Sequence, residues 1–414
     1  MHRRSDCRAC GSRDLELVFS LKASPIGDAY VTLERLNVLQ PSYPIDLHMC
    51  RQCGLAQIMD VIDPEILYGE YIYVTASSMG LAEHFRGYAD SVTDRCRLSP
   101  GSLVVDIGSN DGTLLRRFQE RGMSVLGVEP AAHIAAQATS AGIKTIDKFF
   151  TPDLARQMVA EHGHAKIVTA NNVFANIDDL MSWVNAVNEL LAFDGVFVFE
   201  SYYLADLVQN MVFDFIYHEH LSAFSIKPIH ALFERVGLEL VAVQRVSTKG
   251  GSLRYFVQRP GGPLAKDGSV AEMRELEDSM GLYRKETFSA FSDKVNGLKR
   301  ETQKFLAQAK SEGKSIAGFG ASITGTTLIY HFEIGGYLDY LVDDNLAKQG
   351  RFSPGLHLPV LPTSAIYEHE RKPDYVVILA WRFAEPFIRK NNAYLESGGC
   401  FVIPVPEFKV VANG

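Results

Sequence analysis

Short apolar runs alternate with amphipathic stretches through the middle of the chain. The apolar runs are residues 103–107, 124–128, 167–170 and 196–199, and each has the length of a buried strand. The stretches between them carry apolar positions at helical spacing, and a further helix is expected at about 80–95. This alternation predicts an α/β fold in which a parallel sheet has helices on both faces.

A second alternating region follows residue 314. Residues 316–322 read as a strand and a turn into a helix, and further strands are expected at 340–342, 375–379 and 400–403. Between the two regions, at 271–306, apolar residues recur every three or four positions. That spacing indicates amphipathic helices that connect two α/β units.

The N-terminal residues 1–70 are expected to form a separate, loop-rich module. A chain of 414 residues is too long for one ordinary hydrophobic core, so more than one domain is expected. We therefore predict a small module at 1–70, a Rossmann-like domain at 71–260, and a helical connector with a second Rossmann-like α/β domain at 261–414.

Composition and charge argue against two classes of partner. Hydrophobic residues make up 47% and charged residues 22% of the chain, as in ordinary globular proteins. The net charge of −8 argues against nucleic acid, whose binding proteins carry a basic surplus. The uncharged stretch at 315–330 is too short and too rich in Gly, Ser and Thr to span a bilayer, and no segment typical of a signal peptide follows the N-terminus. A cytoplasmic protein is expected.

Four of the six cysteines form two C-x-x-C pairs near the N-terminus. They are Cys7, Cys10, Cys50 and Cys53, and a glycine follows each pair. In a reducing compartment such clustering indicates a metal rather than disulfides. Four thiolates suit one tetrahedral Zn²⁺ and leave no open coordination position, which predicts one structural zinc ion. A redox pair is the alternative for a single C-x-x-C, and the second pair favours zinc.

A glycine-rich turn after the first central strand is the candidate cofactor site. Asp106 ends the strand, Gly108 and Gly112 flank the turn, and Ser109 and Asn110 lie between the glycines. Glycine lets the backbone approach a ligand closely, and the N-terminus of the following helix offers N–H groups to a carboxylate such as that of a methionine moiety.

The next two strand ends extend this candidate site. Glu129 ends the second strand, where a carboxylate can accept hydrogen bonds from two ribose hydroxyls. Asp147 and Lys148 follow the third strand and are placed beside the adenine. The turn reads D-x-G-x-x-x-G rather than the dinucleotide pattern G-x-G-x-x-G, which favours S-adenosylmethionine (SAM) as the cofactor. A generic α/β domain with a glycine-rich turn is the alternative.

Further motifs are spread over the chain. Besides the cysteine pairs and the cofactor turn, they are Tyr-x-Tyr-x₃-Ser-Ser from residue 71, NNVFAN at 171–176, FDFIYHEHL at 213–221, GGSLR at 250–254, Gly-x-Gly-Ala-Ser at 318–322 and KQGRFSPG at 348–355. FDFIYHEHL is the most specific of them. Together they resemble, over nearly the whole length, the zinc-containing SAM-dependent deoxysugar C-methyltransferases that act on nucleotide-linked 4-keto sugars.

The resemblance implies a role for each part of the chain. The zinc module helps to cover the sugar, the central domain binds SAM with Asn171 and Asn172 among its contacts, and the C-terminal domain helps to hold the nucleotide. It also implies methylation at carbon 3 beside a 4-ketone, a place in deoxysugar biosynthesis, and a monomer. The substrate-binding residues that it implies are Tyr71, Asn176, Lys249, Arg254, Gly320, Ser322, Asp343 and Arg351.

Carbon methylation sets the chemistry that such a site must perform. A ketone next to the target carbon makes its C–H acidic, so the enzyme needs a base near that C–H and a donor near the developing enolate oxygen. By similarity His220 is the base, and an imidazole suits this role because its pKa lies near working pH. Tyr217 is assigned to the enolate oxygen, Glu219 to orienting the histidine or contacting the sugar, and Tyr73 to the same pocket. His218 is expected to be structural.

The chain departs from the family pattern at three places. Asn176 stands where many relatives carry a histidine, and asparagine cannot act as a base near neutral pH. Lys249 stands where a histidine is frequent, and the turn at 320–325 lacks a common lysine. These changes concern the identity of the substrate more than the class of reaction.

Three alternatives stay open at this point. The first is an O- or N-methyltransferase in which His220 deprotonates a hydroxyl. The second is an NAD-dependent oxidoreductase built on the turn at 318–320 with Asp343 on the ribose, although that turn lacks the third glycine of the dinucleotide pattern. The third is a binding protein that has kept the scaffold without the activity.

Overall fold

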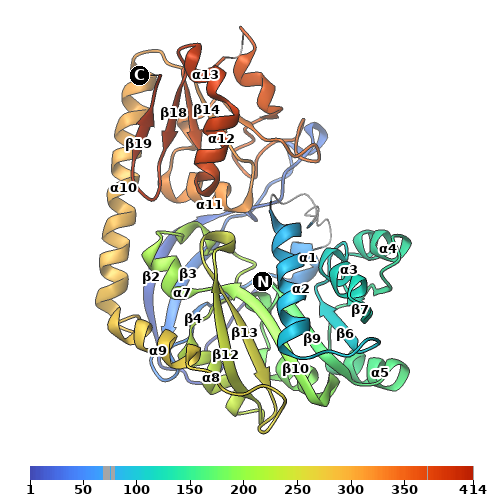
Figure 1. Ribbon diagram of the computed structural model, residues 1–414. Helices are drawn as coiled ribbons and strands as arrows, with labels where there is room; N and C mark the ends of the chain where they lie inside the picture. The colour runs from blue at the N-terminus through green and yellow to red at the C-terminus, as the bar shows by residue number, and fades with distance from the viewer. Residues whose placement is uncertain (69–74, 76–79, 371, 414) are drawn as a thin grey trace.

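The computed structural model describes residues 1–68, 75, 80–370 and 372–413, and one long helix runs along its side from the central to the C-terminal part (Figure 1). Tyr71 and Tyr73, predicted to lie in the substrate pocket, fall outside the described residues. The predicted domain boundary after residue 70 also lies there, and the boundary after residue 260 falls between two elements. This division stays a prediction.

A seven-stranded sheet forms the centre of the molecule. Its order is β12-β13-β10-β9-β6-β7-β8, and β13 is antiparallel to both of its neighbours. Its strands are β6 (Leu103–Ile107), β7 (Ser124–Val128), β8 (Thr145–Ile146), β9 (Ala165–Asn171), β10 (Leu191–Tyr202), β12 (Glu239–Val246) and β13 (Ser252–Gln258). The four predicted central strands are confirmed. The sheet is mixed rather than wholly parallel, because the chain reverses through Gly250 and Gly251, whose φ angles are 88° and 127°.

Helices cover both faces of this sheet, as the alternating pattern predicts. Val104 of β6 packs with α2 and α3, whereas its neighbour Val105 faces the side of α5, α6 and α8, because successive strand residues point to opposite faces. The helices of this part are α2 (Leu81–Arg95), α3 (Thr113–Glu120), α4 (Ala132–Ser140), α5 (Pro152–His162), α6 (Leu180–Leu190), α7 (Leu204–Gln209) and α8 (Ile226–Glu234).

The N-terminal part is a four-stranded antiparallel sheet of order β11-β4-β3-β2. Its strands are β2 (Leu15–Ser24), β3 (Tyr43–Cys50), β4 (Ala56–Ile58) and β11 (Ser222–Ala223), beside a short pair, β1 (His2–Arg3) and β5 (Asp60–Val61), and the helix α1 (Pro64–Tyr68). The expected loops are present at 4–14 and, apart from the short helix at 33–35, at 25–42, but the sequence did not predict the sheet. Phe19 and Leu21 on β2, and Ile45 and Leu47 on β3, alternate with polar residues, so one face of the sheet is buried.

The C-terminal part is a second α/β unit, as predicted. Its sheet has the order β16-β15-β14-β17-β18-β19, and its pairs are parallel except for β18 with β19. Its elements are β14 (Ile316–Phe319), α11 (Ile323–Phe332), β15 (Tyr340–Val342), β16 (Val360–Leu361), β17 (Tyr375–Ile378), α12 (Ala384–Lys390), α13 (Asn392–Glu396), β18 (Cys400–Ile403) and β19 (Lys409–Val411).

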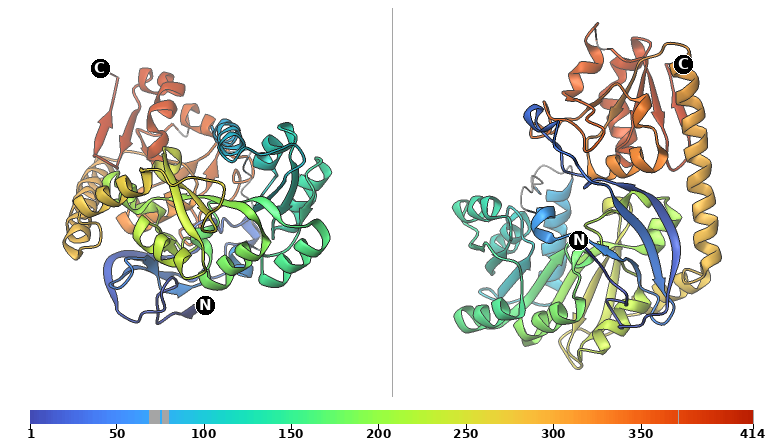
Figure 2. Two further views of the ribbon diagram at one scale, coloured as in Figure 1. Left: turned by 60° about the horizontal axis from the view of Figure 1, so that its bottom comes forward. Right: turned by 180° about the vertical axis from the view of Figure 1, so that it is seen from behind.

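The predicted amphipathic connector is confirmed as α9 (Ser269–Ser279) and α10 (Lys285–Ser311). Helix α10 has 27 residues and is therefore about 40 Å long. Phe288, Phe291 and Val295 are buried on its inner face, where it packs on β2 and α11. It runs along the outside of the molecule from the central part to the C-terminal sheet (Figure 2). Within the described ranges, none of the helices combines the length and the apolarity needed to cross a membrane.

Candidate active site

A cavity of about 1840 Å³ lies where the three parts meet. The central sheet contributes the turn after β6 and the segments that follow β7, β8 and β9. Asp28 and Val61 line it from the N-terminal part, and Ser322 and Asp343 line it from the C-terminal part. Pockets for one drug-sized ligand are about 300–1,000 Å³, so this cavity has room for more than one such ligand.

Two glycines shape the turn after β6, as predicted. Gly108 has a φ of 73°, and a Cβ on it would lie 2.2 Å from Cγ2 of Val173. Gly112 has a φ of 75° and precedes α3 as its N-cap, where a Cβ would lie 3.0 Å from Ile143. Both positions need glycine for the left-handed backbone and for space. Gly108 lines the cavity, whereas Gly112 starts the helix behind it.

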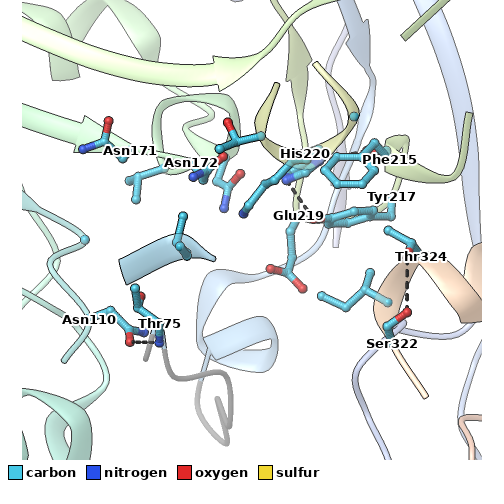
Figure 3. Close-up of a pocket in the computed structure, with 18 of the residues that line it drawn as sticks. Thr75, Asn110, Asn171, Asn172, Phe215, Tyr217, Glu219, His220, Ser322 and Thr324 are labelled. Carbon is cyan, nitrogen blue, oxygen red and sulfur yellow. Dashed lines mark hydrogen bonds between the residues drawn. The ribbon is translucent and has the colours of Figure 1, made fainter. Parts of the chain in front are cut away.

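The carboxylate of Glu129 is held by two backbone N–H groups. Its Oε1 accepts from Ala131 at 2.9 Å, and its Oε2 accepts from Asn110 at 3.0 Å. Asn110 has a φ of 50°, and its Oδ1 accepts from the backbone N–H of Thr75 at 2.8 Å (Figure 3). A carboxylate oxygen has two lone pairs, so each oxygen of Glu129 can accept one further hydrogen bond. This donor and acceptor pattern fits the ribose diol of SAM.

Asp106 is the last residue but one of β6, just before the same turn. Its Oδ1 accepts a hydrogen bond of 2.6 Å from Oγ1 of Thr169. Burial raises the pKa of Asp106 to about 7, which outweighs the lowering by Thr169, and the nearby Glu129 raises it further. A cationic ligand beside these two carboxyls would favour their ionised forms.

Most of the predicted cofactor residues line the cavity. They are Asp106, Gly108, Ser109, Asn110, Glu129, Lys148, Asn171 and Asn172. Asp147 does not, because β8 ends at Ile146 and the next side chain points to solvent. The two asparagines are anchored to the strand beside them. Asn171 Oδ1 accepts from the backbone N–H of Glu200 at 3.0 Å, and Asn172 donates its N–H to the Glu200 carbonyl at 2.8 Å.

His220 and Tyr217 form a hydrogen-bonded pair at the cavity wall (Figure 3). Nδ1 of His220 lies 2.8 Å from the carbonyl oxygen of Phe215, which can only accept, so this nitrogen carries the proton. Nε2 therefore holds the lone pair, and the Tyr217 hydroxyl donates to it at 2.8 Å. The imidazole is stacked between Tyr217 and Tyr202, with ring centroids 3.9 and 4.7 Å away. Burial lowers the pKa of His220 to about 3, so the ring is neutral and, contrary to the expectation from the sequence, its pKa does not lie near working pH.

Glu219 points into the cavity between the Asn110–Thr75 pair and the Ser322–Thr324 pair (Figure 3). Burial raises the pKa of Glu219 to about 8, and Lys249 acts in the opposite direction. Burial also lowers the pKa of Lys249 to about 8, and both side chains line the cavity. Glu219 does not orient His220, because both ring nitrogens of the histidine pair with other groups.

Two neighbouring predictions concern His218 and Asn176. His218 packs edge-on against Tyr43, with Nε2 3.3 Å from the Tyr43 carbonyl oxygen, which is the structural role expected for it. Asn176 ends the short helix η3 (Phe174–Asn176) and lines the cavity, as a substrate contact must.

The C-terminal wall contains Ser322 and Asp343. Ser322 is the N-cap of α11, and its Oγ accepts from the N–H of Gly325 at 3.0 Å. Asp343 follows β15, and its Oδ2 accepts from the N–H of Ala321 at 2.7 Å. Gly320 does not line the cavity, but its φ of 106° makes the turn that places its neighbours there.

Two arginines predicted to bind substrate do not line the cavity. Arg254 on β13 is buried, donates through Nε to Glu200 at 2.7 Å, and lies 4.1 Å above the ring of Tyr88. Arg351 donates to the carbonyl of Tyr30 at 3.4 Å. Glu200 satisfies the charge of Arg254, and the ring of Tyr88 packs against its guanidinium, so this side chain is part of the scaffold. This geometry corrects the substrate role expected for Arg254, whereas the role of Arg351 stays a prediction, although its side chain is not among those that line the cavity.

Sequence reasoning missed Trp381 and Arg382, which line the cavity from the short helix η8 (Trp381–Phe383). Both donate hydrogen bonds to the buried carboxylate of Asp214, which belongs to the FDFIYHEHL segment. No motif marks this pair. The sequence could have indicated these two residues only by their position just after the predicted strand β17, since ligands of parallel α/β sheets bind at the carboxyl ends of the strands.

The four predicted zinc ligands converge on one point. The Sγ atoms of Cys7, Cys10, Cys50 and Cys53 all lie within 4.8 Å of one another. The Cys7–Cys53 and Cys10–Cys50 pairs are each 3.5 Å apart. A tetrahedron with Zn–S bonds of about 2.3 Å has edges of about 3.8 Å, so the donor set fits a closed Zn²⁺ site. Such an ion would tie the two C-x-x-C turns together.

The cysteine module is continuous with the segment that carries His220. Strand β4 begins just after Cys53, and Ile58 at its end donates to the carbonyl of Leu221 at 3.0 Å. Arg8, between Cys7 and Cys10, is buried and donates to the carbonyl of Ile58 at 2.6 Å. The backbone next to His220 is thus held by the sheet that the cysteines anchor.

Comparison with known proteins supplies the family. Three family models match in sequence: "Putative zinc binding domain" at residues 7–68, "Methyltransferase domain" at 81–243 and "C-methyltransferase C-terminal domain" at 247–406. C-methyltransferase NovU of Streptomyces niveus is 33% identical over 408 residues, which cover 98% of this chain and 97% of that protein.

Solved structures match the chain only in part. The magnesium protoporphyrin IX methyltransferase ChlM from Synechocystis PCC 6803, with bound SAH, covers 44% of this chain and 84% of its own, at 17% identity and a TM-score of 0.34. The plantazolicin methyltransferase BamL covers 44% and 86%, at 12% identity and a TM-score of 0.36.

The family matches decide between the alternatives that the sequence left open. They give no support to a nicotinamide-dependent oxidoreductase or to methylation of oxygen, since the C-terminal model and the full-length relative are both C-methyltransferases. The four-cysteine cluster and the cofactor turn agree with the zinc-binding and methyltransferase models in both place and chemistry. The chain belongs to the C-methyltransferase family and is a SAM-dependent methyltransferase with a zinc-binding module.

Proposed function

We propose that this enzyme methylates carbon 3 of a nucleotide-linked 4-keto deoxysugar and that His220 is its general base. The observation that carries the proposal is the His220–Tyr217 pair, a neutral imidazole and a phenol 2.8 Å apart on the wall of the cavity that the cofactor turn also lines. Methylation of carbon requires removal of a carbon-bound proton, and these two groups are suited to accept it and to stabilise the resulting charge.

His220 accepts the proton through Nε2. Its Nδ1 is committed to the Phe215 carbonyl, so the lone pair is on the nitrogen next to Tyr217. Burial favours the neutral ring, which keeps that lone pair available at neutral pH. After the transfer the imidazolium faces the enolate, and this opposite charge offsets part of the cost of burying a cation.

Tyr217 and Glu219 stabilise the enolate oxygen. The Tyr217 hydroxyl leaves Nε2 as that nitrogen takes the carbon-bound proton, and it then donates to the ketone oxygen. Glu219, with a pKa raised to about 8 by burial, is a neutral carboxylic acid at pH 7 and can donate a second hydrogen bond. When bound, SAM would supply an electrophilic methyl group and leave as S-adenosylhomocysteine, while the electron pair of the broken C–H bond becomes the new carbon–methyl bond and the proton stays on His220.

The size and lining of the cavity support a nucleotide-linked substrate. The volume of about 1840 Å³ exceeds what a single drug-sized ligand occupies, so a cofactor and a large second substrate fit together. The cavity extends from the cofactor turn past Lys249 and Asn176 to Ser322 and Asp343. The last two lie at the carboxyl ends of β14 and β15, where parallel α/β sheets bind nucleotides.

Deuterium exchange at carbon 3 tests the base without methyl transfer. TDP-, GDP- and CDP-linked 4-keto-6-deoxysugars are incubated in D₂O with the enzyme and S-adenosylhomocysteine and followed by NMR. The wild-type enzyme is expected to introduce deuterium at carbon 3 of one of them, and His220→Gln to do so at least ~100-fold more slowly. The control is His230→Gln, on the exposed side of α8.

Two results would contradict the proposal separately. Exchange at the wild-type rate in His220→Gln would remove His220 as the base. With SAM present, a product whose new methyl group is on another carbon would remove the carbon-3 assignment. Loss of exchange and turnover in His220→Gln, with S-adenosylhomocysteine binding intact, would also show that the wild-type chain is an enzyme and not only a binding protein.

A further inference from the structure

We propose that Arg382 is a positioning residue for His220, acting from the C-terminal part through Asp214 and Phe215. The inference rests on the proposed role of His220 as the base. It adds a connection between the two ends of the cavity. A residue of the C-terminal wall holds the backbone segment whose carbonyl fixes the tautomer of His220.

The first link is the carboxylate of Asp214, which is fully buried in the short helix η4 (Phe213–Phe215). Nη1 of Arg382 lies 2.8 and 2.9 Å from its two oxygens, and Nε1 of Trp381 donates to Oδ2 at 3.0 Å. Both donors come from η8 of the C-terminal sheet, 167 and 168 residues away. A buried carboxylate depends on such partners, so η4 is held to η8.

The second link is Phe215, the next residue along the chain. The guanidinium of Arg382 lies 4.5 Å above its ring, a cation–π contact. The carbonyl of Phe215 is the acceptor for Nδ1–H of His220 at 2.8 Å. This bond decides which ring nitrogen carries the proton, and so it leaves Nε2 as the acceptor that faces Tyr217. A shift of η4 would therefore weaken the hydrogen bond that sets the tautomer.

The third link is to the cavity. Nη2 of Arg382 donates to Oγ1 of Thr324 at 3.2 Å, in the first turn of α11, and Thr324 Oγ1 lies 3.1 Å from Oγ of Ser322 (Figure 3). Arg382 thus spans the start of α11, which lines the substrate cavity, and the segment that orients the base. Substrate bound against α11 would act on the same guanidinium that holds η4.

Steady-state kinetics of four variants test the coupling. Arg382→Lys keeps the charge but lacks the planar fork, and Asp214→Asn removes the buried charge. Thr324→Val removes the hydroxyl that contacts both Arg382 and Ser322, and Arg389→Lys, exposed on α12, is the control. Arg382→Lys and Asp214→Asn are expected to lower kcat by 10- to 100-fold with a change below threefold in KM for SAM. Their double variant is expected to be no worse than the more impaired single variant.

NMR of ¹⁵N-labelled histidine provides a readout that does not need turnover. Wild-type His220, assigned with His220→Gln, is expected to show one protonated and one unprotonated ring nitrogen. In Arg382→Lys the two signals are expected to move toward each other as the tautomers mix. Arg382→Lys alone carries the test if Asp214→Asn does not fold, since Arg382 is only partly buried and its charge is retained.

Specific outcomes overturn the inference. A rise in KM for the sugar nucleotide with unchanged kcat would make Arg382 a substrate contact. Unchanged His220 signals, or effects of Arg382→Lys and Asp214→Asn that multiply in the double variant, would break the chain of contacts. If His220→Gln kept wild-type hydrogen exchange, the base assignment would fail, whereas the tautomer signals would still report whether Arg382 positions the ring.

Discussion

Glu219 predicts an alkaline limit to activity that one substitution should remove. Its pKa is raised to about 8 because the side chain is buried, so the carboxyl is protonated below pH 8 and ionised above it. In the proposed mechanism only the protonated form can donate a hydrogen bond to the enolate oxygen. The active fraction should therefore fall about tenfold for each pH unit above 8, to roughly one tenth at pH 9 and one hundredth at pH 10.

Glu219→Gln keeps a donor that does not titrate, so the fall above pH 8 should disappear. The assay is kcat/KM for the sugar nucleotide from pH 6 to 10, with methyl transfer followed by mass spectrometry. Lys249, whose pKa is lowered to about 8 by burial, titrates in the same range, so Lys249→Met is measured in parallel. The exposed Glu272→Gln on α9 is the control. If kcat/KM still fell above pH 8 in Glu219→Gln but not in Lys249→Met, the alkaline loss of activity would belong to Lys249 and the assignment to Glu219 would be refuted.

Three further predictions follow from the geometry. Gly108→Ala should weaken S-adenosylhomocysteine binding at least ~10-fold by calorimetry, because its Cβ would meet Val173 at 2.2 Å; equal affinity would mean that the turn can relax. Cys53→Ser should lose bound zinc by atomic absorption together with most turnover, because β4 holds the backbone after His220; full activity without metal would contradict this link. Phe291→Ala should lower the free energy of unfolding, measured in urea, by about 3–5 kcal/mol, because this ring is buried with its centroid 5.0 Å from that of Phe19. A loss below about 1 kcal/mol would mean that the packing of α10 on β2 does not depend on this contact.

The sequence predicts best what short-range pattern determines. Strand and helix periods located the central and C-terminal sheets, and the cysteine spacing predicted a cluster that the structure closes to within 4.8 Å. The N-terminal strands were missed although they show a period of two. Phe19 and Leu21 lie on β2, which packs against α10 and α11 of the far C-terminal half of the chain, so what buries this face is not visible in the local sequence.

The candidate site was predictable where a motif marks it and not where tertiary pairing decides. Arg254 follows the glycine pair of a family motif, yet Glu200 and Tyr88 occupy its guanidinium. Arg382 has no motif, and its importance appears only when Asp214 lies beside it, 168 residues away in sequence. Pairings between buried charges far apart in a chain leave no local trace in one sequence.

Strand β11 has a consequence for engineering. Its two residues, Ser222 and Ala223, directly follow His220 and Leu221 in the chain, yet they complete the sheet of the N-terminal part by pairing with Gln57 and Ala56. In a chimera that joins the first 68 residues of one relative to the remainder of another, β4 and β11 would come from different parents and would have to pair with each other. Parts of such enzymes should therefore be exchanged with the β4 and β11 sequences taken from the same parent.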